Sequence, residues 1–351
     1  MKPKIWIFCL LFLITLSVNG QLDTNYVVRY NDRLVVSLFQ GYRYQKFIIT
    51  QNEISDTALR STIDYTSPSR YYNGFGIDWD KISFSLSWRT PGKQADEKKT
   101  GTATARNLSV SLNAKKIRFE LSHRFYQGFY DNNTVNIPNF NDTTPYYQNG
   151  DLEMDSWKVK AILFHNKRNR FSYAAAYANT QRQIKTSAAW VLLSNLYYQK
   201  IYSGQGFIPV TVSDTFYTKY RDLNRFDLAG LSISAGFSAN IVIFKRLFAN
   251  ATLAWGPQLQ YRRIRGEDGN PDYSETKLSL TSGDARFSFG YNGKYIFIYS
   301  WIMGDYSILK FEDFIMNSQL ISGGVTLGYR FKFKENKVTR FIKNNKWYQM
   351  L

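Results

Sequence analysis

The feature that most constrains this chain is a two-residue alternation of apolar and polar side chains, which recurs from residue 33 to residue 333. In the stretch ISGGVTLGYRFKF, residues 321–333, the row that starts at Ile321 is apolar apart from one glycine. The intervening row contains only Ser, Gly, Thr, Arg and Lys. Successive side chains of a strand point to opposite faces, so this stretch is a two-faced strand. The question is whether its apolar row faces a core or lipid.

Strand length and aromatic content favour lipid. Several alternating segments exceed the ~5–6 residues usual for strands of globular proteins and reach the ~9–11 residues of a tilted membrane strand. Aromatic residues make up 17% of the chain, and Tyr and Trp are typical of membrane–water interfaces. No apolar run after residue 20 approaches the ~18 residues of a transmembrane helix. We therefore predict an all-β fold, a transmembrane antiparallel up-and-down β-barrel. A secreted soluble β protein is the alternative.

The first twenty residues have the pattern of a cleavable secretory signal peptide. Lys2 and Lys4 precede an apolar run over 5–16, and small residues flank a cleavage position after Gly20. Cys9 is the only cysteine, so the mature chain has no disulfide, thiol nucleophile or zinc–thiolate site. We expect export to the outer membrane of a Gram-negative bacterium. The expected organisation is a signal peptide over 1–20, a periplasmic segment over 21–32, the barrel over 33–333 and a basic periplasmic tail over 334–351.

The connections between the alternating segments differ in length. Short ones such as 79–81 and 292–294 alternate with long polar ones such as 91–103 and 131–150. Outer-membrane barrels have short periplasmic turns and long outer loops. We therefore expect twelve strands with both termini periplasmic. The predicted strands cover 33–50, 70–79, 81–90, 104–114, 116–130, 151–165, 169–182, 226–240, 246–264, 276–291, 294–307 and 318–333.

Residues 186–203 also have the composition of a strand. A single extra strand would place the carboxy terminus outside the cell. Either 207–220 supplies a further strand, for a total of fourteen, or the region 183–225 is an excursion from a twelve-stranded barrel. The sequence leaves both possibilities open.

Three stretches carry a family resemblance. They are 64–91, with a proline-containing loop and a hairpin; 170–193, RFSYAAAYANTQRQIKTSAAWVLL; and 285–299 together with the closing GYRFKF. They resemble a family of Bacteroidota outer-membrane proteins catalogued only as a domain of unknown function, over roughly residues 30–333. The chain departs from the family pattern at Ala189, where a glycine is expected, and at Trp190, where a serine is expected. The resemblance implies an outer-membrane β-barrel and no assigned activity.

The polar rows contain the candidate functional residues. A charged side chain on the lipid face near the midplane would cost about 2–4 kcal/mol, so charged strand residues belong in the lumen or at the interfaces. An open lumen with a basic lining would favour anions. A filled lumen would pair the same residues with Glu120, Asp78 or Asp80, and a barrel of this size is compatible with either state. The expected lumen-lining residues are Lys81, Arg89, Arg118, Glu120, Arg124, Lys158, Lys160, Arg262, Arg330 and Lys332.

Large aromatic residues lie within or beside the apolar rows, where they are expected to mark the membrane interfaces. These are Trp79, Trp88, Trp157, Trp255, Trp301, Phe331 and Phe333.

The sequence offers little support for catalysis. The only histidines are His123 and His165. Ser122 and Ser172 are near them in sequence, but neighbours on a strand face opposite sides, which disfavours a serine–histidine pair. We expect no catalytic residue, no metal and no cofactor.

The formal charge of +18 suits an anionic surface. We expect outer-membrane lipids, lipopolysaccharide and the barrel-assembly machinery as partners, and no nucleic acid. The expected function is porin-like: a narrow channel or transporter for anionic or small polar solutes, or a structural envelope component. Surface binding or adhesion through the long loops is the alternative, and an outer-membrane lipid hydrolase is less favoured.

Overall fold

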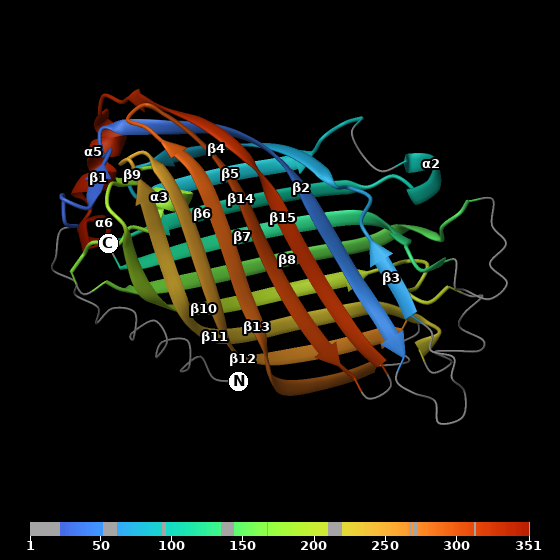
Figure 1. Ribbon diagram of the computed structural model, residues 1–351. Coiled ribbons are helices and arrows are strands. Elements are labelled where there is room, and N and C mark those ends of the chain that lie inside the picture. The colour runs from blue at the N-terminus through green and yellow to red at the C-terminus, as the bar shows by residue number, and fades with distance from the viewer. Residues whose placement is uncertain are drawn as a thin grey trace.

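The computed structural model describes residues 22–51, 62–92, 96–114, 116–134, 144–166, 168–209, 220–266, 269, 272–311 and 314–350. The predicted signal segment and the centres of several long loops lie outside these residues. Within the described part, twelve strands form a closed antiparallel barrel (Figure 1). The predicted fold class and the strand number of twelve are therefore confirmed, and the fourteen-stranded alternative is not adopted.

The barrel strands follow one another around the wall, and the last closes on the first. β15 pairs with β2 over its whole length, from Phe314 opposite Gln51 to Lys332 opposite Arg33. The strands are β2 (Arg33–Gln51), β4 (Tyr71–Trp79), β5 (Ile82–Arg89), β6 (Thr104–Asn113), β7 (Ile117–Asp131), β8 (Gln148–His165), β10 (Ser187–Tyr202), β11 (Leu223–Ile243), β12 (Leu247–Gly266), β13 (Asp272–Asn292), β14 (Ile296–Lys310) and β15 (Phe314–Lys332).

The wall is uneven in height. β4, β5 and β6 have 9, 8 and 10 residues, whereas the neighbouring β2 has 19. The short β3 (Thr62–Thr66) occupies the space above them, because it pairs with the upper part of β2 on one side and with the end of β7 on the other. This arrangement satisfies strand edges that would otherwise lie unpaired.

Alternation along each strand places the apolar row outside the barrel. On β12, Leu253 and Trp255 are 53% and 58% exposed, whereas Thr252 and Arg262 are buried. On β15, Leu327 is exposed and Arg330 is buried. A soluble barrel would show the opposite pattern, because its core needs the apolar row. The apolar row of 321–333 therefore faces outward.

One end of the barrel is filled by the connection between β8 and β10. We call this end, where β2 begins and β15 ends, the terminal end, and residues 166 and 168–186 the plug. The plug contains α3 (Ala174–Tyr177) and β9 (Gln181–Gln183). β9 pairs with β1 (Val27–Arg29), and Figure 1 shows these elements gathered at the terminal end.

The predicted strand over 169–182 is therefore wrong, and β10 takes its place in the barrel. The small residues Ala174, Ala175 and Ala176 allow a helical turn to be buried inside the wall. Asn169 and Asn179 have φ angles of 53° and 57°, which a strand does not adopt. Both features turn the chain into the lumen instead of along the sheet.

The opposite end, which we call the loop end, is filled by an apolar cluster. Phe207, from the connection between β10 and β11, lies with its ring centroid 4.8 Å from that of Phe226 and 6.4 Å from that of Phe47. The hydroxyl of Tyr65 donates a 2.6 Å hydrogen bond to the carbonyl of Phe207. The loop-end cluster also includes buried Phe129 and residues from β7, β8, β11 and β15.

The tail is folded at the terminal end. It forms α5 (Lys337–Asn344) and α6 (Lys346–Met350). Asn336 caps α5 by accepting from the backbone N–H of Thr339 at 2.9 Å. Tyr348 of α6 packs on Trp79 at the foot of β4, with ring centroids 6.4 Å apart. None of the described helices is long and apolar enough to span a membrane.

Candidate functional site

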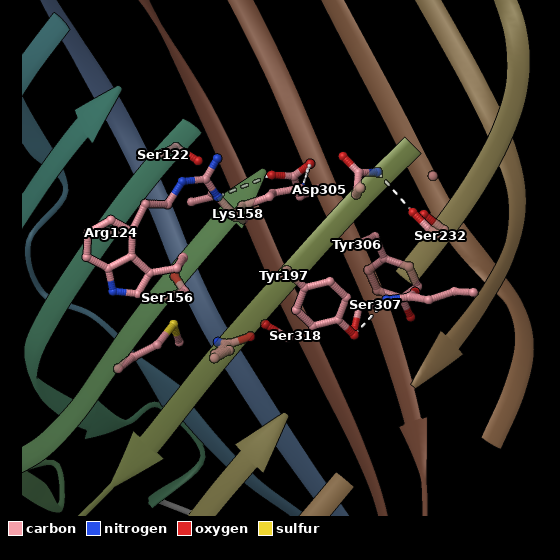
Figure 2. A pocket seen from close by; sticks show the side chains of 18 of the residues that line it. Ser122, Arg124, Ser156, Lys158, Tyr197, Ser232, Asp305, Tyr306, Ser307 and Ser318 are labelled. Carbon is pink, nitrogen blue, oxygen red and sulfur yellow. Dashed lines mark hydrogen bonds and ion pairs between the residues drawn. The ribbon is translucent and has the colours of Figure 1, made fainter. Parts of the chain in front are cut away.

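The middle of the lumen contains two adjoining cavities between the plug and the loop-end cluster. Ser122 and Arg124, successive residues of the inward row of β7, line both of them. The first cavity, of ≈ 120 Å³, lies against β8, β10 and β14 (Figure 2). The second, of ≈ 180 Å³, lies against the short strands β4, β5 and β6. Its hydroxyl-rich wall includes Ser37, Ser83, Ser85, Ser87, Ser109 and Ser111.

Two cations share one carboxylate where the cavities meet. Nη1 of Arg124 lies 3.2 Å from Oδ2 of Asp305, and Nζ of Lys158 lies 3.3 Å from Oδ1 of the same group (Figure 2). The three side chains come from β7, β8 and β14 and keep between 20% and 26% of their surface exposed. This partial exposure means that the three side chains border the cavity and are not enclosed by neighbouring side chains.

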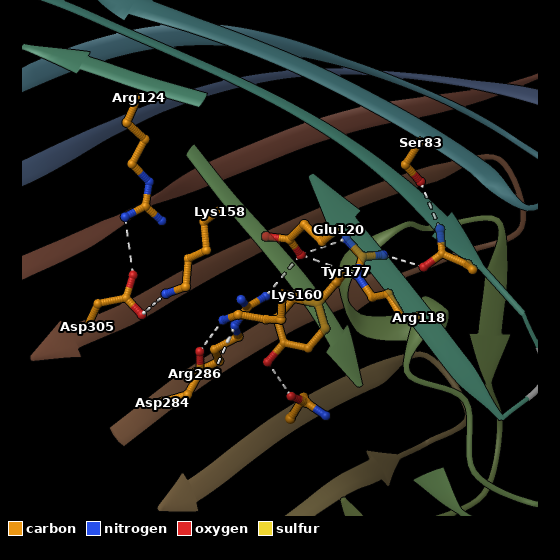
Figure 3. Close-up of polar contacts among 12 residues, drawn as sticks. Ser83, Arg118, Glu120, Arg124, Lys158, Lys160, Tyr177, Asp284, Arg286 and Asp305 are labelled. Atoms are coloured by element: carbon orange, nitrogen blue, oxygen red, sulfur yellow. Dashed lines mark hydrogen bonds and ion pairs between the residues drawn. The ribbon is translucent and has the colours of Figure 1, made fainter. Parts of the chain in front are cut away.

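A second group of charges lies deeper and is buried. Lys160 contacts Asp284, and Nε of Arg286 lies 3.2 Å from Oδ1 of that aspartate (Figure 3). Nη1 of Arg286 is also 3.5 Å from Oε2 of Glu120, which Nη2 of Arg118 approaches at 3.3 Å. Each carboxylate in this group contacts two cations, so its charge is well compensated.

Strand register explains why these charges converge. Glu120 on β7 lies directly opposite Lys160 on β8, and Asp284 on β13 lies opposite Asp305 on β14. Five cations meet three carboxylates, which gives the group a formal net charge of +2 at neutral pH. We call this group the lumenal charge network. It consists of Arg118, Glu120, Arg124, Lys158, Lys160, Asp284, Arg286 and Asp305.

Two of the predicted lumen residues bind other parts of the protein instead of facing a cavity. Arg330 is fully buried against the plug, where its guanidinium donates to the carbonyls of Asn179 and Gly293, both at 2.7 Å. Arg262 is buried at the loop end, where it donates to the carbonyl of Lys310 at 2.7 Å. Arg330 therefore binds the plug, and the guanidinium of Arg262 lies 5.4 Å from the centroid of the Phe311 ring in the loop-end cluster.

Three other predicted lumen residues lie at the rims. Lys81 lies in the hairpin turn between β4 and β5, where its ammonium donates to the carbonyl of Tyr348 at 2.6 Å. Arg89 pairs with Glu97 of α2 (Glu97–Thr100) at the loop end. Lys332 is exposed at the last position of β15. All three residues lie at or just beyond the ends of their strands, and none of them lines either cavity.

The predicted interface aromatics divide between the two faces. Trp88, Trp157 and Trp255 are exposed on the outer surface, and so is Phe331. Trp79 and Phe333 contact each other at the terminal end, with ring centroids 6.3 Å apart.

Trp301 corrects the prediction, because it faces the lumen. Ile298 and Ile302 occupy the outward row of β14, so the residue before Ile302 must point inward. Nε1 of Trp301 donates to the hydroxyl of Thr326 at 3.2 Å, and the ring lines the second cavity.

His123 lies on the outer surface beside a carboxylate. Its Nε2 is 3.0 Å from Oδ1 of Asp155, and its ring stacks on Trp157 with centroids 4.3 Å apart. Ser122 points to the lumen, away from this pair. The described residues contain no group of three or more His, Cys, Asp or Glu side chains placed to hold a metal ion.

A family model described as "Domain of unknown function (DUF4421)" matches residues 21–331. The chain belongs to this family. No curated protein matches it at a significant level. The family description assigns no activity.

Several solved structures are similar over most of the chain. The outer membrane protease OmpT from Escherichia coli is 8% identical, with a TM-score of 0.39 over 87% of this chain and 98% of that chain. An outer membrane channel from Pseudomonas putida F1 is 7% identical, with a TM-score of 0.36 over 89% and 100%. The translocator domain of the autotransporter NalP from Neisseria meningitidis is 10% identical, with a TM-score of 0.31 over 93% and 96%.

Sequence reasoning missed two of the three carboxylates of the lumenal charge network and one of its arginines. Asp284, Arg286 and Asp305 were not among the expected lining residues. The signal was present, since Asp284 and Arg286 alternate with Ala285 and Phe287 in GDARFSFG. Because side chains alternate between the two faces of a strand, an outward Phe287 would have predicted that Asp284 and Arg286 both face the lumen.

Proposed function

We propose that this protein is an outer-membrane β-barrel that binds a small anionic solute in its lumen and passes it across the membrane when one closure opens. The apolar exterior supports the membrane location, because strands with an apolar outward row and a polar inward row are typical of barrels that face lipid. The predicted signal segment supports export. The basic lumen supports an anionic solute.

The observation that carries this proposal is the sharing of Asp305 by Arg124 and Lys158. One carboxylate balances only one of the two cations, so a positive charge remains beside the cavity. The buried Lys160–Asp284 pair, in contrast, has side chains only 3% and 5% exposed and serves the wall. A guanidinium and an ammonium converging on one space are suited to bind a phosphate, sulfate or carboxylate.

Filling at both ends favours a gated transporter over an open pore. The plug and the loop-end cluster bury apolar side chains across the lumen in the described part of the chain. A solute in the cavities must therefore wait for local opening at one end. Loop and plug motions of this kind occur on microsecond to second timescales.

Isothermal titration of the purified barrel with inorganic phosphate tests the proposal. We expect saturable binding that weakens about tenfold or more in the Arg124→Gln/Lys158→Gln double variant, because both charge-assisted hydrogen bonds are lost. Arg263→Gln is the matched control, since Arg263 pairs with Asp272 on an exposed surface. Absence of binding of phosphate, sulfate and acetate by the native chain would refute the proposal.

A further inference from the structure

The barrel wall contains a break between β13 and β14. Among the described residues, the ladder that joins these strands ends where Gly283 lies opposite Tyr306. Both strands continue beyond this point: β13 remains paired with β12 as far as Asp272, and β14 remains paired with β15 as far as Lys310. The two strands therefore separate toward the loop end.

A bulge explains the separation. Gly256 of β12 lies opposite Ser282 of β13, but Gln258 lies opposite Ser279, so β13 has one extra residue where β12 has Pro257. A proline cannot donate to the ladder and is found at bulges or edges. Bulges bend a strand and increase its local twist. The bend directs the upper part of β13 away from β14.

Side chains bridge the top of the break. The ammonium of Lys277 on β13 and the guanidinium of Arg262 on β12 both donate to the carbonyl of Lys310 on β14, at 3.2 Å and 2.7 Å. The break is therefore a bounded window. Its lower edge is the Gly283–Tyr306 pair and its upper edge is this bridge.

Two hollows, one on each face of the wall, meet at the lower edge of the window and share residues there. The first lumenal cavity is lined there by Ser282, Gly283, Asp305, Tyr306 and Ser307, and Figure 2 shows Asp305, Tyr306 and Ser307 at its edge. A hollow of ≈ 500 Å³ on the outer face is also lined by Gly283, Asp305 and Tyr306, and it lies over the paired residues directly below the window. The remaining lining includes outward-facing Leu253, Trp255, Ala285, Gly304 and Ile321.

The two sides of the window differ in chemistry. Small residues at 283, 285 and 304 create the outer hollow, and large apolar side chains such as Trp255 and Ile321 border it. The inner side meets the cations Arg124 and Lys158. An apolar chain suits the outer side and an anionic group suits the inner side.

We propose that this window is a lateral portal, through which a single-chain anionic amphiphile passes between the outer leaflet and the lumen. Its head group binds at Arg124 and Lys158, and its chain lies in the hollow beside Trp255. This inference rests on the proposed role of the lumenal cations and extends it by naming the substrate class. A fatty acid and a lysophospholipid phosphate share the required chemistry.

Gly304 offers a direct way to fill the hollow. A Cβ added at Gly304 would have no neighbour closer than the carbonyl of Leu320, at 4.0 Å, so Gly304→Leu can be accommodated by the wall. Gly150 is the matched control. It lies on β8, and an added Cβ there would meet nothing within 4 Å.

The experiment is photo-crosslinking of the full barrel in phospholipid nanodiscs with a fatty acid that carries a diazirine at its chain end. We expect saturable labelling of peptides that contain Trp255 or residues 283–285. Labelling should fall at least about fivefold in Gly304→Leu, a loss of about 1 kcal/mol in binding, and stay unchanged in Gly150→Leu.

Unlabelled competitors identify the source of the ligand. Competition by dodecanoate alone indicates a fatty acid, competition by lysophosphatidate alone indicates a lysophospholipid, and competition by both indicates selection by charge and chain only. Equal competition by dodecanol would overturn the anionic selection. Lys158→Gln should weaken competition by the anionic compounds and leave that by dodecanol unchanged.

Phosphate titration of the same samples separates the two proposals. If phosphate binds but labelling is non-saturable or insensitive to Gly304→Leu, the portal is refuted and the lumenal anion site stands. If phosphate does not bind and labelling is saturable but indifferent to Lys158→Gln, the lumenal site is refuted, and with it the head-group part of the portal.

Discussion

The hydroxyl of Tyr348 donates a 2.9 Å hydrogen bond to Oδ2 of Asp80, which ties the last helix of the chain to the turn between β4 and β5. The two residues are 268 positions apart in the sequence. Lys81 strengthens the junction by donating to the carbonyl of Tyr348, and its ammonium lies 4.8 Å from the centroid of the Tyr348 ring. The tail is therefore part of the folded barrel end.

We predict that alkaline pH releases the tail. Burial, followed by the Asp80 carboxylate, raises the pKa of Tyr348. A group whose pKa is raised on folding stabilises the docked state fully below its ordinary pKa, near 10 for a tyrosine, and loses this contribution as pH rises through the raised value. Fluorescence of Trp79, which stacks on Tyr348, should change above about pH 10.

Tyr348→Phe is the control for this titration. The ring is retained but the hydrogen bond is lost, so tail docking should weaken by about 0.5–1.5 kcal/mol at neutral pH. Proteolysis of the tail should be faster in this variant. A Trp79 transition of the same size in the native chain and in Tyr348→Phe would show that other tyrosines cause it.

Arg330→Gln should loosen the plug. The guanidinium holds the plug through the carbonyl of Asn179 and the wall through Gly293 and Asn292. Losing buried hydrogen bonds to a charged group costs about 1.5–3 kcal/mol each at most, and glutamine can replace only part of them. We expect more frequent conductance events in planar bilayers. Arg246→Gln, in an exposed turn at the same end, should leave the conductance unchanged.

Asp305→Asn should stabilise anion binding and destabilise the fold. Removing the carboxylate leaves Arg124 and Lys158 without their shared partner. Because these side chains are partly exposed, the loss in the free energy of unfolding should be about 1–2 kcal/mol, below that of a fully buried pair. Urea unfolding and phosphate titration measure the two effects. Asp272→Asn, whose carboxylate is 41% exposed, should change neither.

Trp255 and Trp301 should respond differently to membrane-dissolved quenchers. Trp255 is 58% exposed on the outer surface, whereas Trp301 faces the lumen and donates to Thr326. Brominated lipids should quench Trp255, so Trp255→Phe should lower the quenchable fraction of the fluorescence. Trp301→Phe should not lower it. The reverse result would place the apolar row inside the barrel.

Local alternation was sufficient to predict most of the wall. It located β2, β7, β12 and β15 because their apolar rows are long and regular. It failed at 169–182, where Phe171 and Tyr173 alternate as in a strand but are buried against Phe164 inside the barrel. A row that packs on a plug and a row that packs on lipid have the same composition.

The sequence predicted which side chains face the lumen but not which of them contact one another. Parity placed Arg118, Glu120 and Lys160 on one side of their strands without knowledge of the rest. The partners of Lys160 and Glu120 are Asp284 and Arg286 on β13, more than 120 residues away, and only closure of the barrel brings them together. The bulge beside Pro257 was equally hidden, because it depends on the register between two strands.

The plug imposes an order on assembly. It lies in the middle of the chain, yet it binds strands that follow it: Tyr177 donates to Asn250, and the backbone of Ala175 and Asn179 accepts from Asn292 and Arg330. The binding site of the plug in the lumen is therefore incomplete until the last strand is in place. We expect pairing of β2 with β15 and docking of the plug to be one cooperative, late event. Without the docked plug, Arg330 would be buried without its hydrogen-bond acceptors.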